Sequence, residues 1–110
     1  MKTSLAKEIG VSGAPDFMKY YSNLTNQPMK KHIDNAMDVL KSKPNAGNSI
    51  QRNRWPEKYI AEHDITNLFR YELPDGYRLI YTIMSEPNKI TCLLLEVFNH
   101  TEYEKRFGYS

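Results

Sequence analysis

The sequence predicts an α+β fold, a helical hairpin packed on an antiparallel sheet of at least three strands. Two observations support this prediction. Apolar residues recur at helical spacing before residue 44, and three strand-like runs joined by two short turns fill Leu68–Phe98. At 110 residues, the chain fits a single domain, residues 1–110, with one hydrophobic core.

The helical hairpin is predicted from two apolar stripes. The first helix begins at Pro15, a residue suited to a first helical turn, and its stripe is Phe17, Tyr20, Tyr21 and Leu24. A break at Asn23–Pro28 precedes a second helix over Pro28–Lys43, whose stripe is Ile33, Ala36, Met37 and Leu40. Residues 1–14 are weakly patterned, and they fit an edge strand, a partial helix or an arm.

A polar segment, Lys43–Asn53, is loop-like because it is rich in Asn, Gly and Ser. A short helix is predicted over Pro56–Glu62, and Trp55 is expected to pack against the sheet edge. The meander follows, with strands over Asn67–Leu73, Tyr77–Met84 and Ile90–Phe98 and turns at Pro74–Gly76 and Ser85–Lys89. A charged tail, Asn99–Ser110, ends the chain as a short helix or an extended arm.

The predicted register places charged residues on one face of the meander. Counting back from the turns puts Met84 opposite Ile90, Arg78 opposite both Glu72 and Glu96, and Arg70 opposite Ile80. Two interpretations of this row remain open. Arg78 is either a structural partner of the two carboxylates, with Glu96 favoured as its ion-pair partner, or a phosphate ligand. The other face is expected to pack on the helices and carries Phe69, Tyr71, Leu73, Tyr77, Leu79, Tyr81, Ile83, Leu93, Leu95 and Val97.

The composition excludes several classes of protein. The net charge of +2, from 15 basic and 13 acidic residues, is too small for a strongly basic nucleic-acid-binding chain. The single cysteine, Cys92, lies in an apolar strand and rules out an intrachain disulfide or a Cys-based zinc site. The three histidines show no metal-ligand spacing, and His32 and His63 are expected to be exposed. Because no run is long and apolar enough for a membrane span or signal peptide, we expect a cytoplasmic protein.

One stretch resembles a known protein family. The string GYRLIYTI, the apolar strand after it and the segment His100–Arg106 (HTEYEKR) resemble the RelE/ParE superfamily, the toxin components of toxin–antitoxin systems. The order of hairpin, loop, meander and short basic tail is similar as well. The likeness is closest to the compact RelE-like branch. It is specific over Leu68–Phe107 and extends in organisation over Phe17–Tyr109.

This resemblance implies a curved antiparallel sheet and a partner antitoxin that neutralises the toxin. It also implies an endoribonuclease that cuts mRNA, often on the ribosome, with no metal or other cofactor. In such cleavage the RNA 2′-hydroxyl attacks the adjacent phosphate, an arginine stabilises the developing charge, and other groups transfer the proton. An alternative is a non-catalytic interaction protein on the same fold, either ParE-like in its target or bound only to an antitoxin.

The family motif maps residue by residue onto this chain. Arg78 matches the arginine after the Gly-Tyr of the second strand, and His100 matches a histidine that exchanges protons in some RelE-like members. Tyr103 lies near a tyrosine that stacks on or positions the substrate. Glu72 stands where members that cut mRNA tend to carry a lysine. The implied site therefore comprises Arg78, His100 and Tyr103 as catalytic residues, and Arg70, Lys105 and Arg106 as RNA-binding residues. Arg52, Arg54 and Lys58 are interpreted as general surface charge.

Overall fold

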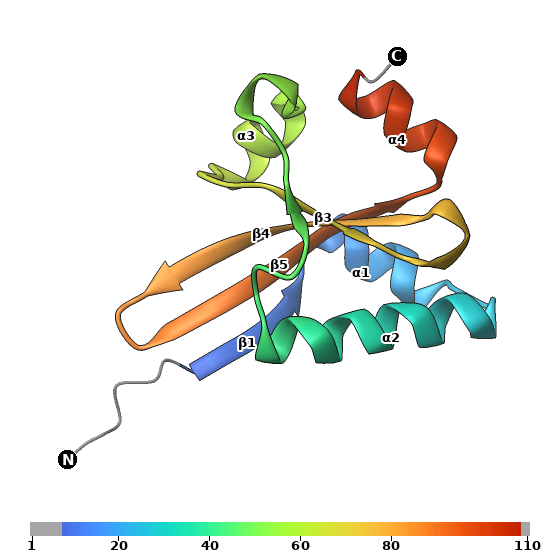
Figure 1. The fold of residues 1–110 in the computed structure, drawn as a ribbon, viewed down its shortest axis with the longest axis horizontal. Coiled ribbons are helices and arrows are strands. Elements are labelled where there is room, and N and C mark those ends of the chain that lie inside the picture. The colour runs from blue at the N-terminus through green and yellow to red at the C-terminus, as the bar shows by residue number, and fades with distance from the viewer. Residues whose placement is uncertain (1–7, 109–110) are drawn as a thin grey trace.

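A computed structural model describes residues 8–108, which form four α-helices around a five-stranded sheet (Figure 1). The helices are α1 (Pro15–Ser22), α2 (Gln27–Ser42), α3 (Glu57–His63) and α4 (His100–Phe107). The strands are β1 (Glu8–Gly13), β2 (Asn48–Ser49), β3 (Phe69–Glu72), β4 (Arg78–Glu86) and β5 (Lys89–Phe98). Two 3₁₀ turns, η1 (Arg52–Arg54) and η2 (Pro74–Gly76), complete the fold. The predicted α+β class is confirmed.

The sheet is mixed, with the strand order β1-β5-β4-β3-β2. Strands β3, β4 and β5 pair in antiparallel fashion, as the sequence predicts, and β2 adds antiparallel to β3, but β1 runs parallel to β5. The expectation of an antiparallel sheet is therefore wrong at this edge. Parallel neighbours need a long crossover connection, and here everything from α1 to β4 lies between β1 and β5. Of the three options for residues 1–14, the strand is observed at Glu8–Gly13. Residues 1–7 lie outside the described part of the chain.

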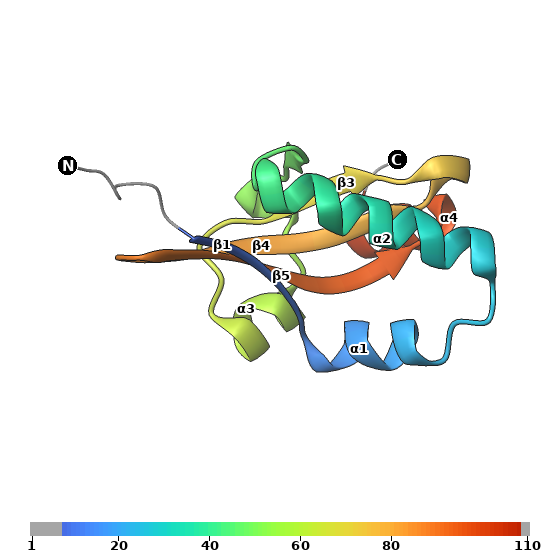
Figure 2. The same cartoon turned by 90° about the horizontal axis from the view of Figure 1, so that it is seen from below.

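The hairpin helices form close to their predicted bounds. Pro15 occupies the first turn of α1, and the Asn26 side chain caps α2 by accepting the Met29 N–H at 3.0 Å. The Tyr21 hydroxyl joins the two helices by donating to Asp34 at 2.6 Å. Figure 2 shows α2 on one side of the sheet and α1 on the other, toward α3. The hairpin thus wraps an edge of the sheet, whereas the sequence predicts that it covers one face. Phe17 of α1 nevertheless packs in the same cluster as Ile33 and Leu40 of α2.

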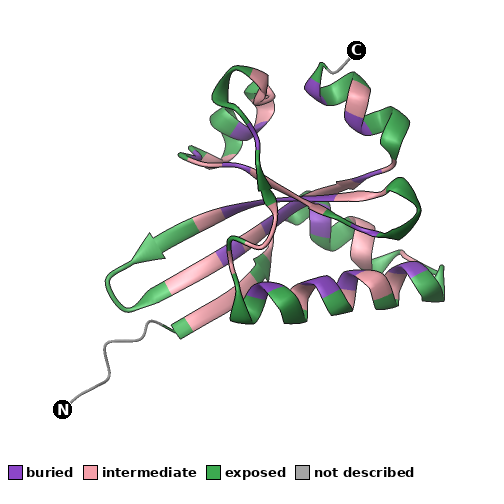
Figure 3. Cartoon of the chain, in the orientation of Figure 1, coloured by how far each residue is buried: buried purple, intermediate pink, exposed green. Residues whose placement is uncertain are grey.

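Apolar side chains cover both faces of the sheet in two clusters, and the buried residues of β4 and β5 lie along the middle of the sheet (Figure 3). Beneath α2 the central members are Leu79, Tyr81, Cys92 and Leu94, which meet Ile33, Ala36 and Leu40 of the helix. On the opposite face the cluster joins α3 and α4 to the sheet through Tyr59, Ile80, Leu95, Phe98, Tyr103 and Phe107. Trp55 packs against this second cluster and donates its indole N–H to the Ile50 carbonyl at 2.7 Å. The sheet face that packs against α3 and α4 is therefore apolar over much of its area.

The register of β5 differs from the predicted one. Both β4 and β5 continue into the turn, so Met84 lies opposite Thr91, and a β-bulge between Ile80 and Tyr81 adds a second shift. Arg78 consequently lies opposite Phe98, and the predicted Arg78–Glu96 pairing is wrong. The shift at the turn moves Leu93 to the α3–α4 face, where Leu95, the extra residue of the bulge, also lies, whereas Val97 beyond the bulge is on its predicted face. The predicted β3–β4 register, with Glu72 opposite Arg78 and Arg70 opposite Ile80, is confirmed.

Tyr81 locks the loop between α2 and β3 onto the sheet. Its hydroxyl donates to the Pro44 carbonyl at 2.7 Å and accepts the Gly47 N–H at 3.0 Å. A Cβ atom at Gly47 would lie 2.6 Å from the Arg70 carbonyl oxygen and 2.9 Å from the Tyr81 hydroxyl, so only glycine fits this close approach. The polar segment predicted as a loop thus contributes a short edge strand, β2, beside Arg70.

We predict that Tyr81→Phe lowers the free energy of unfolding by about 1–3 kcal/mol at pH 7. The change keeps the buried ring but leaves the Pro44 carbonyl and the Gly47 N–H without their hydroxyl partner. Urea unfolding followed by circular dichroism measures the difference. An unchanged midpoint would show that neither hydrogen bond contributes net stability.

We predict a second effect of this residue at alkaline pH. Burial raises the pKa of Tyr81 to about 12, whereas a tyrosine in the unfolded chain ionises near pH 10. The stabilisation is therefore complete below about pH 10 and is lost as the pH rises toward about 12. The wild-type protein should lose roughly 1–3 kcal/mol more than Tyr81→Phe across this interval. Burial also raises the pKa of Tyr59, which is present in both proteins, so only the difference between their unfolding curves is diagnostic.

Candidate functional site

The ends of three elements meet at one side of the molecule (Figure 1). Arg70 and Glu72 lie on β3, Arg78 opens β4, and α4 starts directly after β5. A capping box begins α4, because the Asn99 side chain accepts the Glu102 N–H at 2.8 Å and the Glu102 carboxylate accepts the Asn99 N–H at 3.1 Å. This start places His100 in the first turn and Tyr103 one turn later.

Tyr103 is a buried platform for two arginines. Its side chain is only 1% exposed, and its ring stacks on Phe107 with 4.5 Å between centroids. The Arg70 guanidinium donates to the Tyr103 hydroxyl at 3.1 Å, and the Arg78 guanidinium carbon lies 4.9 Å from the ring centroid. Both arginines are attracted to the electron-rich face of the ring. A ring this buried positions the arginines and is not open for stacking on a nucleotide base.

His100 sits between a donor and an acceptor. Its Nδ1 lies 3.1 Å from Arg78 Nη1, and its Nε2 lies 2.9 Å from a Glu104 carboxylate oxygen. A guanidinium has only donors, so Nδ1 accepts and the ring proton is on Nε2. In this arrangement His100 is neutral, and its lone pair is on the nitrogen nearest Arg78.

Glu72 completes the group, which we call the arginine cluster: Arg70, Glu72, Arg78, His100 and Tyr103. Its carboxylate oxygen Oε2 lies 3.1 Å from Arg70 Nε and 3.8 Å from Arg78 Nε. Arg78 is held further by a hydrogen bond from Nη1 to the Gly76 carbonyl at 3.0 Å. The cluster thus combines two fixed cations, one carboxylate and one neutral imidazole, a set that can bind an anion and exchange a proton.

Four of the six residues expected at the site come together, namely Arg70, Arg78, His100 and Tyr103. The other two, Lys105 and Arg106, lie apart from these four. Arg106 Nη1 pairs with Glu96 at 3.2 Å, and Lys105 is exposed beside a shallow pocket of about 300 Å³ that it shares with Phe98, Glu102 and Arg106. Glu104, the partner of His100, is not among the residues expected from the sequence. The i,i+4 spacing of these residues on a helix could have revealed it.

Glu96 forms a separate ionic centre that joins α3 and α4 to β5. It accepts from the Tyr59 hydroxyl at 2.6 Å and pairs with Lys58 at 3.3 Å as well as with Arg106. Lys58 in turn pairs with Asp16 at 2.8 Å, and this contact holds the pKa of the Asp16 carboxyl below its usual value. Lys58 and Arg106 therefore have defined structural partners, so the interpretation of Lys58 as general surface charge is wrong.

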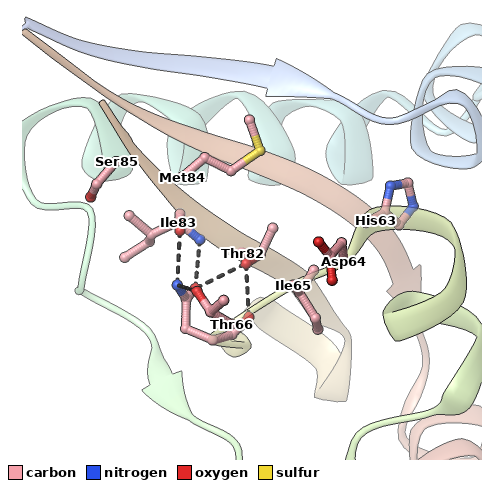
Figure 4. Close-up of a pocket in the computed structure, with 9 residues that line it drawn as sticks. His63, Asp64, Ile65, Thr66, Thr82, Ile83, Met84 and Ser85 are labelled. Carbon is pink, nitrogen blue, oxygen red and sulfur yellow. Dashed lines mark hydrogen bonds between the residues drawn. The ribbon is translucent and has the colours of Figure 1, made fainter. Parts of the chain in front are cut away.

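A pocket of about 320 Å³ lies between the α3–β3 segment and the outer part of β4 (Figure 4). Along this part of β4, the Asn67 side chain makes the hydrogen bonds that a neighbouring strand would otherwise make. It donates to the Ile83 carbonyl at 2.8 Å and accepts the Ile83 N–H at 2.7 Å, and it also accepts from the Thr82 hydroxyl. Figure 4 shows His63 and Asp64 at one side of the pocket, away from these bonds. The polar groups here complete the sheet edge.

Within residues 8–108, no three His, Cys, Asp or Glu side chains are grouped to hold a metal ion. In the same range, no helix is long and apolar enough to cross a membrane. Comparison with models of known protein families found no match, and comparison with curated proteins found none either. Inference about function therefore depends on the geometry of the arginine cluster.

We predict that the neutral His100 ring carries its proton on Nε2. Long-range ¹H–¹⁵N spectra at pH 8 should show a protonated Nε2 and an unprotonated Nδ1, because Glu104 accepts from the former and Arg78 donates to the latter. In Glu104→Ala the two tautomers should become mixed. His32 on α2 serves as the internal reference. A dominant Nδ1-protonated form in the wild-type protein would contradict this arrangement.

Proposed function

We propose that this chain is a RelE-like toxin of a type II toxin–antitoxin system and that it cleaves mRNA without a metal. The observation that carries the proposal is the convergence of Arg78, His100 and Tyr103 with Arg70 at the end of the meander. The resemblance of GYRLIYTI and HTEYEKR to the RelE/ParE superfamily involves three of these residues, Arg78, His100 and Tyr103.

In the proposed reaction the 2′-hydroxyl of one nucleotide attacks the adjacent phosphate. The new 2′-O–P bond forms and the P–O5′ bond breaks, which leaves a 2′,3′-cyclic phosphate and a free 5′-hydroxyl. Negative charge grows on the phosphate oxygens during attack, and the two arginines stabilise it. The Nδ1 lone pair of His100 accepts from Arg78 Nη1 in this structure. Once a phosphate oxygen takes up that donor, His100 can accept the hydroxyl proton on Nδ1, and the same ring can return a proton to the leaving oxygen.

Each remaining part of the cluster has a role in this proposal. Tyr103 fixes both guanidinium groups so that they need not reorganise when charge develops. Glu104 holds the imidazole in the tautomer whose Nδ1 is unprotonated. Partners under this proposal are mRNA, the ribosome and a cognate antitoxin in the cytoplasm. Lys105 is exposed and remains available for RNA contact, whereas Arg106 is engaged by Glu96.

Glu72 favours a second candidate function, a non-catalytic interaction protein on the same fold. Its carboxylate lies within 3.8 Å of both arginine Nε atoms and offsets part of their charge. A protein of this kind binds a protein target, as ParE-type members bind gyrase, or binds only its antitoxin. It leaves RNA intact under all conditions.

We predict that Arg78→Ala lowers the rate of RNA cleavage by about 100-fold or more, because it removes a donor aimed at the developing charge. The assay compares cleavage of mRNA in a cell-free translation reaction with cleavage of naked RNA. Cleavage only during translation identifies a ribosome-dependent nuclease. Cleavage of naked RNA as well identifies a freestanding one.

Arg52→Ala is the matched control, because Arg52 lies on η1 and stacks on Trp55 at 5.1 Å, outside the arginine cluster. Its cleavage rate should equal that of the wild-type protein. Unfolding curves of both variants check that the fold is intact. If the folded wild-type protein cleaves no RNA in either reaction, the proposal of a nuclease fails and the interaction protein is favoured. If Arg78→Ala cleaves RNA at the wild-type rate, Arg78 has no catalytic role.

A further inference from the structure

A single carboxylate oxygen of the chain faces both arginines of the cluster. Glu72 is the last residue of β3 and lies directly opposite Arg78, the first residue of β4. Its Oε2 atom is 3.1 Å from Arg70 Nε and 3.8 Å from Arg78 Nε. A phosphate oxygen bound between two guanidinium groups would occupy the same kind of position, since guanidinium binds carboxylate and phosphate through similar geometry.

The two arginines keep their places through contacts that do not involve Glu72. Arg70 donates to the Tyr103 hydroxyl, and Arg78 donates to the Gly76 carbonyl and contacts His100. The cationic part of the cluster is therefore built independently of the carboxylate. Removal of the carboxylate from this position would leave both guanidinium groups oriented as they are.

Glu72 is more exposed to solvent than either arginine that it contacts. Its side chain is 48% exposed, whereas that of Arg78 is 15% exposed. The buried Arg78 Nε makes no hydrogen bond within the described residues, because the Glu72 oxygen at 3.8 Å is beyond hydrogen-bonding distance. The contact is loose on this side, and an exposed ion pair contributes little to stability. A competing anion can therefore displace Glu72 at low cost.

We propose that Glu72 is an internal competitor for the phosphate-binding position, a carboxylate that an RNA phosphodiester must displace from Arg70 and Arg78. This inference rests on the proposed function in its choice of ligand, a phosphodiester of single-stranded RNA. Glu72 lowers affinity in two ways, because it occupies the arginines before binding and repels the phosphate afterwards. It thereby sets how tightly the protein holds RNA before any chemistry occurs.

The test is equilibrium binding of a single-stranded RNA decamer that carries 2′-O-methyl groups at every position. This probe lacks the attacking hydroxyl, so binding is measured apart from cleavage. Glu72→Gln removes the charge and keeps the shape of the side chain. We expect it to lower the Kd about fivefold, the effect of one unit charge a few ångströms from the ligand in water. An equal or higher Kd would overturn the proposal.

Glu86→Gln is the matched control, with the same change of charge at the other end of β4. Glu86 ends this nine-residue strand and Arg78 begins it, so the two positions are about 26 Å apart. The Kd of this variant should stay at the wild-type value. If Glu86→Gln tightens binding as much as Glu72→Gln does, the effect is one of overall charge, and the competitor role is excluded.

The same substitution in the Arg78→Ala variant tests whether Glu72 lowers RNA affinity by acting on the arginines. In Arg78→Ala, the added change Glu72→Gln should lower the Kd by much less than fivefold, because one of the two competed cations is gone. An equally large fall in Kd in the Arg78→Ala background would overturn the proposal.

The outcome of the binding test can be distinguished from the outcome of the cleavage test. Tighter binding by Glu72→Gln with no RNA cleavage by the wild-type protein would support the competitor and reject the nuclease, and cleavage with unchanged binding would do the reverse.

Discussion

A β-bulge between β4 and β5 determines which side chains of β5 face each half of the core. Ile80 lies opposite Glu96 and Tyr81 lies opposite Leu94, so Leu95 is the extra residue. An extra residue in a strand with a two-residue period reverses the alternation beyond it. Leu95 and Glu96 therefore both face α3 and α4, and beyond them Val97 joins the cluster under α2 and Phe98 joins the cluster under α3 and α4. Both hydrophobic clusters depend on this one irregularity, and so does the position of Phe98, from which the chain enters α4.

The geometry of the arginine cluster depends on the apolar packing beneath α3 and α4. The α3–α4 face buries the aromatic rings of Tyr59, Phe98 and Phe107. Phe107 contacts the other two rings and stacks on Tyr103, which supports the arginines. The site is consequently polar only at its outer surface and is built on a packed apolar base. Side chains held on such a base keep their orientation when a ligand arrives, which is the condition for electrostatic stabilisation of a transition state.

Sequence patterns predicted the parts of this fold that depend on local signals. The Pro-Asp-Gly turn set the β3–β4 register correctly and so brought Glu72 beside Arg78. The β4–β5 register was wrong because the turn spans only Pro87 and Asn88, and because no local signal marks the bulge. For the same reason the true partners of Glu96, which come from α3 and α4, could not be read from strand alternation. Four residues of the arginine cluster were expected from the family resemblance, whereas Glu104 was missed because the sequence left open whether Asn99–Ser110 is a helix or an extended arm, and only a helix brings Glu104 to His100.

The capping box at Asn99 and Glu102 has a consequence for the rotational phase of α4. Each residue advances a helix by about 100°, so the residue at which α4 starts determines the direction of every side chain on it. A start one residue later would turn His100 away from Arg78 and would carry Tyr103 out from under both guanidinium groups. The junction between β5 and α4 is thus a point where a change of length by one residue would dismantle the site while leaving the sheet intact. The length of this junction is therefore a sensitive indicator of whether a related sequence retains the same site.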